Sequence, residues 1–320
     1  MSNQAQAVRF DQYGDRSVLY IADIPMPQPA AGEVLVEVRA AGINPGEASI
    51  RSGALHSRFP ATFPSGQGSD LAGVVTAVGA GVTDFTIGDD VLGYSWQRSS
   101  HATHTVVPVT QLIHKPQALS WTAAGSLYVA GCTAWAAVEA VAPKPGETVA
   151  VSGATGGVGT IAVQLLALRG AHVLGIASSA NAPWLTAHGA VPVPYGDRLA
   201  ADLTAAAPRG VDAFIDLFGP EYVQLAVDLG IPPERIETII SFEKAAQYGT
   251  RTAGSAEGSS REVLAELAAL AASGQLDIPI AATYPLDRVR DAYAALEERH
   301  TRGKIALIPT TDNSAPHSGD

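Results

Sequence analysis

The chain has 320 residues, of which 47% are hydrophobic and 16% are charged. This composition fits one large or two ordinary folded domains and excludes an intrinsically disordered chain. Thirty-one acidic against 20 basic residues give a formal net charge of −11, so neither nucleic acid nor an anionic membrane is the expected partner.

Cys132 is the single cysteine, which excludes an internal disulfide and a multi-cysteine zinc site. It lies in an apolar stretch, so we expect a buried, inert thiol. The segment from Met1 to Arg9 has no apolar core of signal-peptide length, and no run reaches transmembrane length. We therefore expect a cytoplasmic protein.

Short strand patterns separated by glycine-containing turns occupy the first third of the chain. Strands are expected over residues 5–10, 32–42, 70–79 and within 85–93, with a turn and a short helix over 43–53. This spacing predicts a β-rich, barrel-like first domain that extends to about residue 115.

From Thr122 the pattern changes to helices that alternate with strands. We expect a helix over 123–142, further βα units through 184–188 and 211–216, a helix over 262–273, a strand near 280, a helix over 286–299 and a strand over 304–308. The alternation predicts an α/β fold with a parallel, doubly wound sheet. The polar tail 310–320 is expected to be disordered.

The stretch from Val149 to Leu168 carries the strongest motif. A buried-strand pattern ends at Ser152, glycines stand three apart at positions 153, 156 and 159, and an apolar helical pattern follows. This is a close variant of the dinucleotide-binding fingerprint. Glycine permits a sharp turn, close approach of a diphosphate, and tight packing of helix on strand. A glycine turn without a ligand is the structural alternative.

In combination, the motifs resemble those of the medium-chain dehydrogenase/reductase superfamily, in particular its zinc-free quinone oxidoreductase and enoyl reductase branch. The residues that carry the resemblance are Ala41–Pro45, Gly68–Val75, Val129–Trp135, Gly156–Gly159 and Arg302–Ile305. It implies a GroES-like substrate domain (1–122 and 277–320), a Rossmann domain (123–276) and a cleft between them. It also implies a homodimer.

The resemblance raises the question of a metal. Zinc enzymes of the superfamily place cysteine where this chain has Asn44, and His-Glu where it has Ser69 and Asp70. Asparagine and serine are poor zinc ligands. His101 and His104 form an alternative ligand pair, although solvent-facing or core histidines also explain them. We expect no metal site, which disfavours alcohol oxidation and favours reduction of a quinone or an activated C=C bond.

The cofactor type depends on the end of the second Rossmann strand, where an acidic residue would select NAD. This chain has Ser178 and Ser179 there, and Tyr195 matches a family tyrosine that contacts the 2′-phosphate. We expect NADPH, although no Lys or Arg occurs between Arg169 and Arg198. The serines are also suited to an N-cap.

The resemblance also assigns residues to the cofactor site. It places Asn44 and Thr133 near the nicotinamide, with a turn-forming asparagine and a helix-interior hydroxyl as the structural alternatives. Phe242, in the same stretch as Ser241, lies where the family covers the nicotinamide, with an apolar packing role as the alternative. Lys304 follows the last glycine and is expected to approach the cofactor. The expected contacts within the glycine turn are Gly153, Thr155, Gly156, Gly157 and Val158.

Two tyrosines are candidate proton donors or hydrogen-bond partners of a substrate carbonyl. Tyr94 lies at the expected barrel rim, and Tyr128 replaces a proline of the family. Buried tyrosines with satisfied hydroxyls are the alternative, and bulk water is another proton source. Glu47 and Asp70 are possible acids near the site, with helix solvation and a strand-start turn as structural interpretations.

Together these features predict a zinc-independent, NADPH-dependent reductase of a quinone or an enone. A pathway-specific enoyl reductase that tailors a polyketide-like intermediate is the second hypothesis. A non-catalytic NADPH-binding sensor or scaffold is the third.

Overall fold

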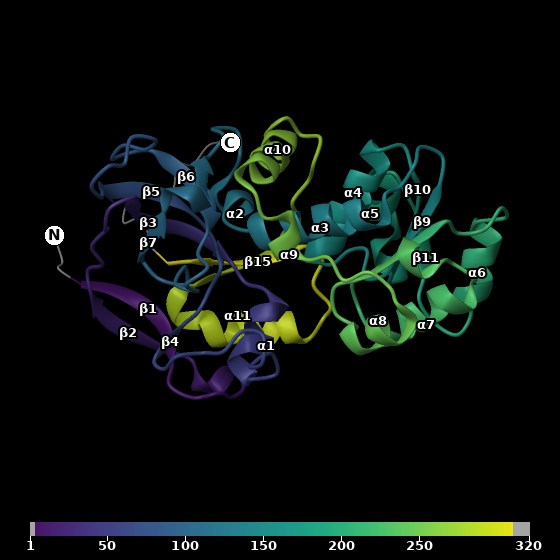
Figure 1. Cartoon of the computed structure of the whole chain (residues 1–320), viewed down its shortest axis with the longest axis horizontal. Coiled ribbons are helices and arrows are strands. Elements are labelled where there is room, and N and C mark those ends of the chain that lie inside the picture. Colours follow the sequence, from purple (N-terminus) through teal and green to yellow (C-terminus); the bar gives the residue numbers. More distant parts are fainter. Residues whose placement is uncertain (1–3, 310–320) are drawn as a thin grey trace. The chain divides into compact units, whose positions relative to one another are not determined.

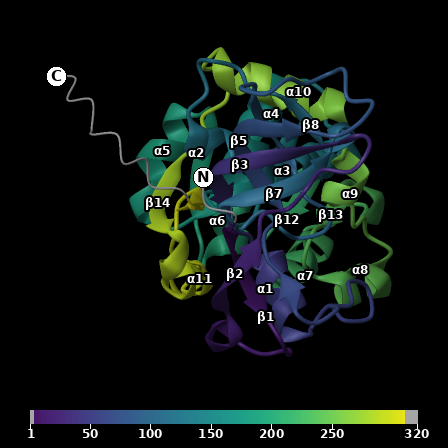
Figure 2. The same cartoon turned by 90° about the vertical axis from the view of Figure 1, so that its left-hand side faces the viewer.

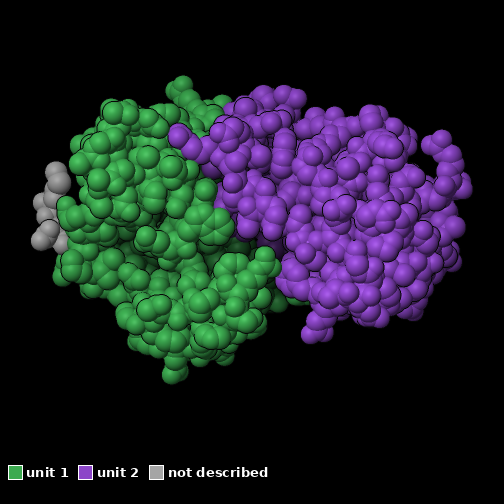
Figure 3. All heavy atoms as spheres, in the orientation of Figure 1, with its two compact units in different colours: residues 1–126, 282–300, 305–320 green, residues 127–281, 301–304 purple. Residues whose placement is uncertain are grey.

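The computed structural model describes residues 4–309. The predicted disordered tail lies outside the described residues. The chain divides into unit 1 (residues 1–126, 282–300 and 305–320) and unit 2 (residues 127–281 and 301–304) (Figures 1 and 3). The predicted boundaries were 122/123 and 276/277.

Unit 1 is rich in strands, as the sequence predicted for the first domain. Its elements are β1 (Gln4–Phe10), β2 (Tyr20–Pro25), β3 (Glu33–Gly42), α1 (Pro45–Ser52), β4 (Ser65–Gly66), β5 (Asp70–Val78), β6 (Asp90–Tyr94), β7 (His104–Pro108), β8 (Leu112–His114), α2 (Trp121–Ala124), β14 (Ile280–Pro285), α11 (Val289–Glu297) and β15 (Lys304–Ile308).

The core of unit 1 follows from the alternating pattern of β3. Val34, Val36 and Val38 are fully buried and pack against Leu71 and Val75 of β5. The large sheet has the order β14-β15-β3-β5-β6-β8, and β7 also pairs with β3. Figure 2 shows β3, β5 and β7 side by side. A separate sheet has the order β2-β1-β4.

Unit 2 alternates helices and strands around a parallel sheet. Its elements are α3 (Tyr128–Val141), β9 (Thr148–Val151), α4 (Gly157–Leu168), β10 (His172–Ala177), α5 (Ala182–Ala187), β11 (Ala190–Pro194), α6 (Leu199–Ala206), β12 (Ala213–Asp216), α7 (Pro220–Asp228), β13 (Ile236–Thr238), α8 (Phe242–Tyr248), α9 (Ser255–Gly258) and α10 (Arg261–Ala272).

The sheet of unit 2 confirms the predicted doubly wound architecture. Its order is β11-β10-β9-β12-β13, and the neighbouring strands pair in parallel. The chain therefore leaves β9 toward β10 on one side and later returns to β12 on the other. In such sheets, ligands bind beyond the carboxyl ends of the strands at this change of direction.

The single helix predicted over 123–142 is wrong, because the chain forms α2 and α3 with a break between them. Gly125 lies in this break, and a Cβ there would be 2.3 Å from the carbonyl oxygen of Ala40. The Gly42 N–H also donates to the Gly125 carbonyl at 2.6 Å. The contact with β3 thus competes with helix continuation, a tertiary effect that local pattern does not reveal.

The structure also bears on the burial of Cys132 and on whether any helix is long and apolar enough to span a membrane. Cys132 is fully buried within α3, as predicted. Among the helices of residues 4–309, none has the length and apolarity needed to cross a membrane.

Candidate active site

The glycine turn joins β9 to α4 in unit 2. Gly153 has a left-handed backbone (φ +58°), and the Gly156 N–H donates to the Gly153 carbonyl at 2.9 Å. A Cβ on Gly159 would be 2.1 Å from the same carbonyl oxygen, so only glycine lets α4 pack on the turn. The first N–H groups of α4, beginning at Gly157, lack helical acceptors and make its N-terminus suited to an anion.

A segment from the far end of the chain completes this turn. The Gly303 N–H donates to the Thr155 carbonyl at 2.9 Å, and Gly303 forms a β-bridge with Gly156. Lys304 is 4% exposed, and its Cδ is 2.9 Å from the position that a Cβ on Gly157 would occupy. The structure thus brings a lysine side chain to the start of α4, beside Gly157, which is one of the predicted cofactor contacts.

The end of β10 is tied to the same turn through Asn181, which the sequence prediction did not include among the site residues. Its Nδ2 donates to Thr155 Oγ1 and to Ser178 Oγ, both at 3.1 Å. Ser179 is exposed, and Tyr195 after β11 is 56% exposed. The side chains at this edge are therefore hydroxyls and an amide, without a carboxylate from 177 to 181.

Asp216, the last residue of β12, connects the carboxyl ends of β9, β12 and β13 through hydrogen bonds. The sequence analysis did not identify it as a site residue. Its Oδ1 accepts from Ser152 Oγ at 2.7 Å and from the backbone N–H groups of Phe218 and Gly219 at 3.0 and 3.1 Å. Its Oδ2 accepts from Thr238 Oγ1 at 2.8 Å and from Ser241 Oγ at 2.9 Å. Five donors stabilise this fully buried side chain.

The Asp216 cluster places the residues predicted to cover the nicotinamide. The hydroxyl of Ser241 donates to Asp216, and Ser241 is 6% exposed. Phe242 follows as the first residue of α8 and is 40% exposed. The buried serine thus anchors the segment while the neighbouring aromatic ring reaches the surface.

Helix α3 carries two more predicted residues. The hydroxyl of Thr133 donates to the Val129 carbonyl at 2.6 Å, one turn earlier. Tyr128 is 2% exposed, and its hydroxyl is 2.5 Å from Ser259 Oγ. Ser259 Oγ in turn donates to the Ser255 carbonyl, so the phenol supplies the proton of the Tyr128–Ser259 hydrogen bond.

In unit 1 the predicted residue Asn44 immediately precedes α1. Pro45 is the first helical residue and Glu47 the third, and the Asn44 N–H donates to Glu47 Oε2 at 3.0 Å. The Asn44 amide donates to Glu47 Oε1 and to Asp70 Oδ2, both at 3.2 Å. All three side chains are buried.

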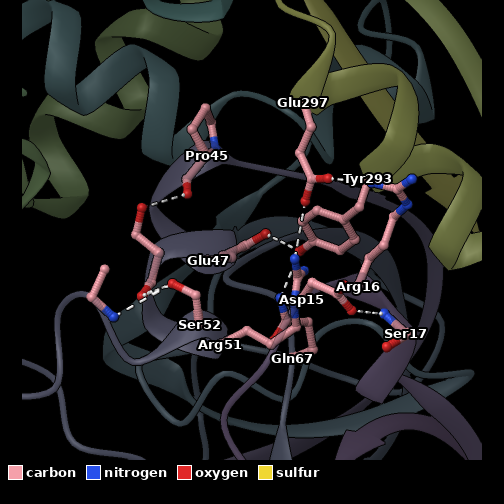
Figure 4. A network of polar contacts seen from close by, with 12 residues as sticks. Asp15, Arg16, Ser17, Pro45, Glu47, Arg51, Ser52, Gln67, Tyr293 and Glu297 are labelled. Atoms are coloured by element: carbon pink, nitrogen blue, oxygen red, sulfur yellow. Dashed lines mark hydrogen bonds and ion pairs between the residues drawn. The ribbon is translucent and has the colours of Figure 1, made fainter.

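Glu47 belongs to a larger buried network that also includes α11 (Figure 4). The Tyr293 hydroxyl donates to Glu47 Oε2 at 2.7 Å and accepts from Gln67 Nε2 at 2.8 Å. Burial, with Glu47 alongside, raises the pKa of Tyr293 well above its usual value, which keeps the phenol protonated. Arg51 stacks on the Tyr293 ring and donates to Glu297 at 3.0 Å.

Tyr94 is brought close to this network by strand pairing. It is the register partner of Asp70 in the β5–β6 ladder, so both side chains project from the same face of the sheet. Tyr94 is 8% exposed and makes an edge contact with the half-exposed ring of Trp96. Of the predicted catalytic residues, Asn44 and Tyr94 are therefore linked through Asp70.

The histidines do not converge. His101 is fully buried, with Nε2 3.2 Å from the Gly42 carbonyl, whereas His104 Nδ1 is 3.2 Å from Thr103 Oγ1. Desolvation lowers the pKa of His104, which favours a neutral ring. In the part of the chain that the structure describes, no three His, Cys, Asp or Glu side chains are grouped to hold a metal.

A cavity of about 840 Å³ lies elsewhere in unit 2. Its lining includes Trp135 and Glu139 of α3, together with Arg251 and Glu257. The described lining contains none of the predicted cofactor or catalytic residues, so this cavity and the glycine turn are separate features.

Comparison with known proteins agrees with this geometry. An alcohol dehydrogenase GroES-like domain model matches residues 30–140, and a zinc-binding dehydrogenase model matches residues 188–307. The quinone oxidoreductase structure from Coxiella burnetii is 30% identical, with a TM-score of 0.85, over 96% of this chain and 100% of that one.

Two further relatives cover almost the whole chain. Escherichia coli quinone oxidoreductase, solved in complex with NADPH, is 27% identical with a TM-score of 0.83, over 95% of this chain and 100% of that one. Human quinone oxidoreductase is 28% identical over 327 residues, which is 95% of this chain and 97% of the relative. The chain therefore belongs to the quinone oxidoreductase branch of the medium-chain dehydrogenase/reductase superfamily and is an oxidoreductase.

Proposed function

We propose that the protein is a zinc-independent, NADPH-dependent reductase that transfers a hydride to a quinone or to the C=C bond of an enone. The observation that carries the proposal is the start of α4, where the glycine turn and the buried Lys304 side chain meet. The N-terminus of a helix favours an anion, and the Lys304 side chain, whose Cδ lies beside Gly157, brings a positive charge to this part of a protein whose net charge is negative.

The residues at the end of β10 support NADPH over NADH. Ser178, whose Oγ accepts from Asn181 Nδ2, has a hydroxyl hydrogen that is able to donate to a phosphate, and no carboxylate stands there to repel it. The solved E. coli relative is a complex with NADPH. In this proposal the turn and Lys304 hold the diphosphate, while Ser178, Ser179 and Tyr195 meet the adenosine ribose phosphate.

The side chains near Asn44 do not fit a catalytic zinc. The Asn44 amide nitrogen donates to two carboxylates, and the Ser69 N–H donates to Glu47 at 2.8 Å. His101 presents Nε2 to a carbonyl oxygen, so this nitrogen carries a proton and is not a ligand. Zinc prefers thiolate, imidazole or carboxylate donors, so an asparagine amide and a protonated imidazole nitrogen do not provide its ligands.

When bound, the nicotinamide supplies the hydride, and the protein orients the acceptor and provides for the proton. Tyr94 is the candidate donor in unit 1, because the proton of Tyr128 is already donated to Ser259. Bulk water is the competing source. A Y94F variant should lose turnover with NADPH binding unchanged if the phenol donates, whereas water as donor would leave turnover intact.

The test of the function is NADPH oxidation, followed by absorbance, with quinones, α,β-unsaturated ketones and unsaturated thioesters as acceptors. We expect turnover with at least one class and slower turnover with NADH. Activity restricted to thioesters would favour a dedicated enoyl reductase. Binding of NADPH without turnover of any acceptor would contradict the proposal and favour a sensor or scaffold.

A further inference from the structure

A cavity of about 170 Å³ lies within unit 1. It is lined by residues of β1, β2, β4 and β7 and of the loop that precedes β7. None of the predicted cofactor or catalytic residues belongs to its described lining, so the cavity is separate from the candidate active site. Its lining combines one arginine, hydroxyl groups and apolar walls, and these groups define the ligand that it would hold.

Arg9 of β1 supplies the charge of the cavity. Its register partner on β4 is Gly66, and Arg9 Nη1 is 3.2 Å from the position that a Cβ on Gly66 would occupy. The guanidinium therefore lies beside a strand position that has no side chain. Within residues 4–309, it makes no hydrogen bond or ion pair with the rest of the chain. Its N–H groups, which can only donate, remain for a ligand.

The charge balance of the cavity differs from that of the whole chain. Arg9 is the one charged residue of the described lining, which contains no Asp, Glu or Lys. Burial lowers the pKa of His104, which also lines the cavity, and this favours a neutral ring. A single guanidinium in an acid-free lining favours an anion of one charge, and its planar fork matches the two oxygens of a carboxylate.

A chain of three hydroxyl groups reaches the same cavity. Ser95 Oγ is 2.9 Å from Ser99 Oγ, which is 2.6 Å from Thr105 Oγ1. The two hydrogen bonds use two of the three hydroxyl hydrogens, so one is left over. Ser99 and Thr105 line the cavity, and either is able to carry this hydrogen, because each hydroxyl both donates and accepts. An anion in the cavity would accept it.

The remaining walls are apolar. Ala7 lies two residues before Arg9 on β1, so both side chains project from one face of the strand. Ile24 of β2 projects from the same face, because it is the register partner of Ala5. Val106 of β7 also lines the cavity. The volume of 170 Å³ equals that of about six water molecules in the liquid, which suits a ligand with a short carbon chain.

We propose that this cavity binds a short aliphatic monocarboxylate. The carboxylate pairs with Arg9 and accepts a hydrogen bond from Ser99 or Thr105. The carbon chain lies against the apolar walls formed by Ala7 and Ile24. Inorganic phosphate has no apolar part for these walls, and an alkylammonium ion has the wrong charge for Arg9. This site does not rest on the proposed function, because no residue of its described lining takes part in that proposal.

Calorimetric titration with butyrate tests the site. Arg9→Met keeps an unbranched side chain but removes the charge and all the donors. We expect it to raise the Kd for butyrate about 10- to 100-fold, as for loss of hydrogen bonds to a charged group. The matched control is Arg16→Met, the same substitution at an exposed arginine of unit 1 that pairs with Glu297. R16M should bind butyrate like the wild type.

Two other probes check the chemistry of the ligand in the wild type. Inorganic phosphate and n-butylammonium should each bind at least about 10-fold more weakly than butyrate, because each lacks one of the matched features. Absence of butyrate binding by the wild type at millimolar concentrations would overturn the proposal. A folded R9M with wild-type affinity, or phosphate that binds as tightly as butyrate, would do the same.

A chemical modification locates the site without a variant that could misfold. Methylglyoxal, a small reagent for arginine, is applied to the wild type with and without butyrate, and peptide mass spectrometry follows Arg9 and Arg16. Butyrate should slow the modification of Arg9 and leave that of Arg16 unchanged. Equal rates at Arg9 with and without butyrate, equal protection of both arginines, or an Arg9 that the reagent does not reach would refute the site.

Discussion

Alanine substitutions at Gly156 and Gly159 separate binding of the diphosphate from packing of α4. Gly156 has φ −73° and ψ −179°, which alanine adopts without strain, and its Cβ would meet only the Gly153 carbonyl oxygen, at 3.4 Å. The Cβ of Gly159 would be 2.1 Å from that oxygen and 2.8 Å from the Ala154 backbone. A methyl group at Gly156 therefore fits the folded protein, whereas one at Gly159 collides with the backbone of the turn.

The geometry sets the expected magnitudes. G156A should change the free energy of unfolding by less than about 1 kcal/mol, because alanine fits the native backbone and restricts the unfolded chain. Its methyl group blocks the approach of a phosphate to the N–H groups of α4. Loss of one hydrogen bond to a charged group costs about 1.5–3 kcal/mol, which raises the Kd for NADPH roughly 10- to 100-fold.

G159A should behave in the opposite way. Two rigid backbone groups stand in the path of the methyl group, so α4 must move and the free energy of unfolding should fall by about 1–3 kcal/mol or more. Urea denaturation followed by circular dichroism measures the first quantity, and NADPH fluorescence titration measures the second. A stable G156A that binds NADPH normally would place the diphosphate elsewhere, and a fully stable G159A would refute the packing argument.

Three further predictions concern buried or enclosed charges. Asp216→Ala leaves five donors without their acceptor and should destabilise the protein by several kcal/mol in urea denaturation, at about 1–3 kcal/mol per unsatisfied buried group. D216N, which retains one accepting oxygen, should cost less, and equal losses would contradict this account. Burial raises the pKa of Glu237 from 4.5 to about 8. The contribution of protonated Glu237 to the free energy of unfolding is therefore fully present below about pH 4.5 and is lost as the pH rises through 8. E237Q should therefore exceed the wild type in unfolding free energy at pH 9 by at least about 1 kcal/mol and lose this advantage near pH 5, and a difference independent of pH would disprove the assignment. Lys304→Met should weaken NADPH binding and make it less sensitive to salt, and an unchanged salt dependence of Kd would remove Lys304 from the diphosphate site.

Much of the fold was predictable because its signals are local. The period-two pattern of β3 and the βα alternation after residue 142 depend on neighbours within one element. The break between α2 and α3 was not predictable, because it arises where Gly125 meets the Ala40 carbonyl of β3. No pattern within residues 123–142 reports a contact with a strand about eighty residues earlier.

The candidate site was predictable only in its residue types. Glycines 153, 156 and 159 predict the turn, and glycine is required at Gly153 by its left-handed backbone and at Gly159 by the close approach of the Gly153 carbonyl. Asp216 ends an ordinary strand pattern, and nothing local distinguishes it from a strand-terminal acid. Its five donors come from Ser152, from the loop after β12 and from the segment that ends β13.

The sequence by itself determined the two kinds of folding pattern, the dinucleotide-type turn and the absence of cysteine ligands, since these depend on residue identity and short-range spacing. Tertiary structure alone decided what each polar side chain does. It placed Lys304 beside Gly157, committed the Tyr128 proton to Ser259 and set Asn44 between Glu47 and Asp70. The physical reason is that a hydrogen-bonding group takes its role from the donors and acceptors that face it, and these partners come from distant parts of the chain.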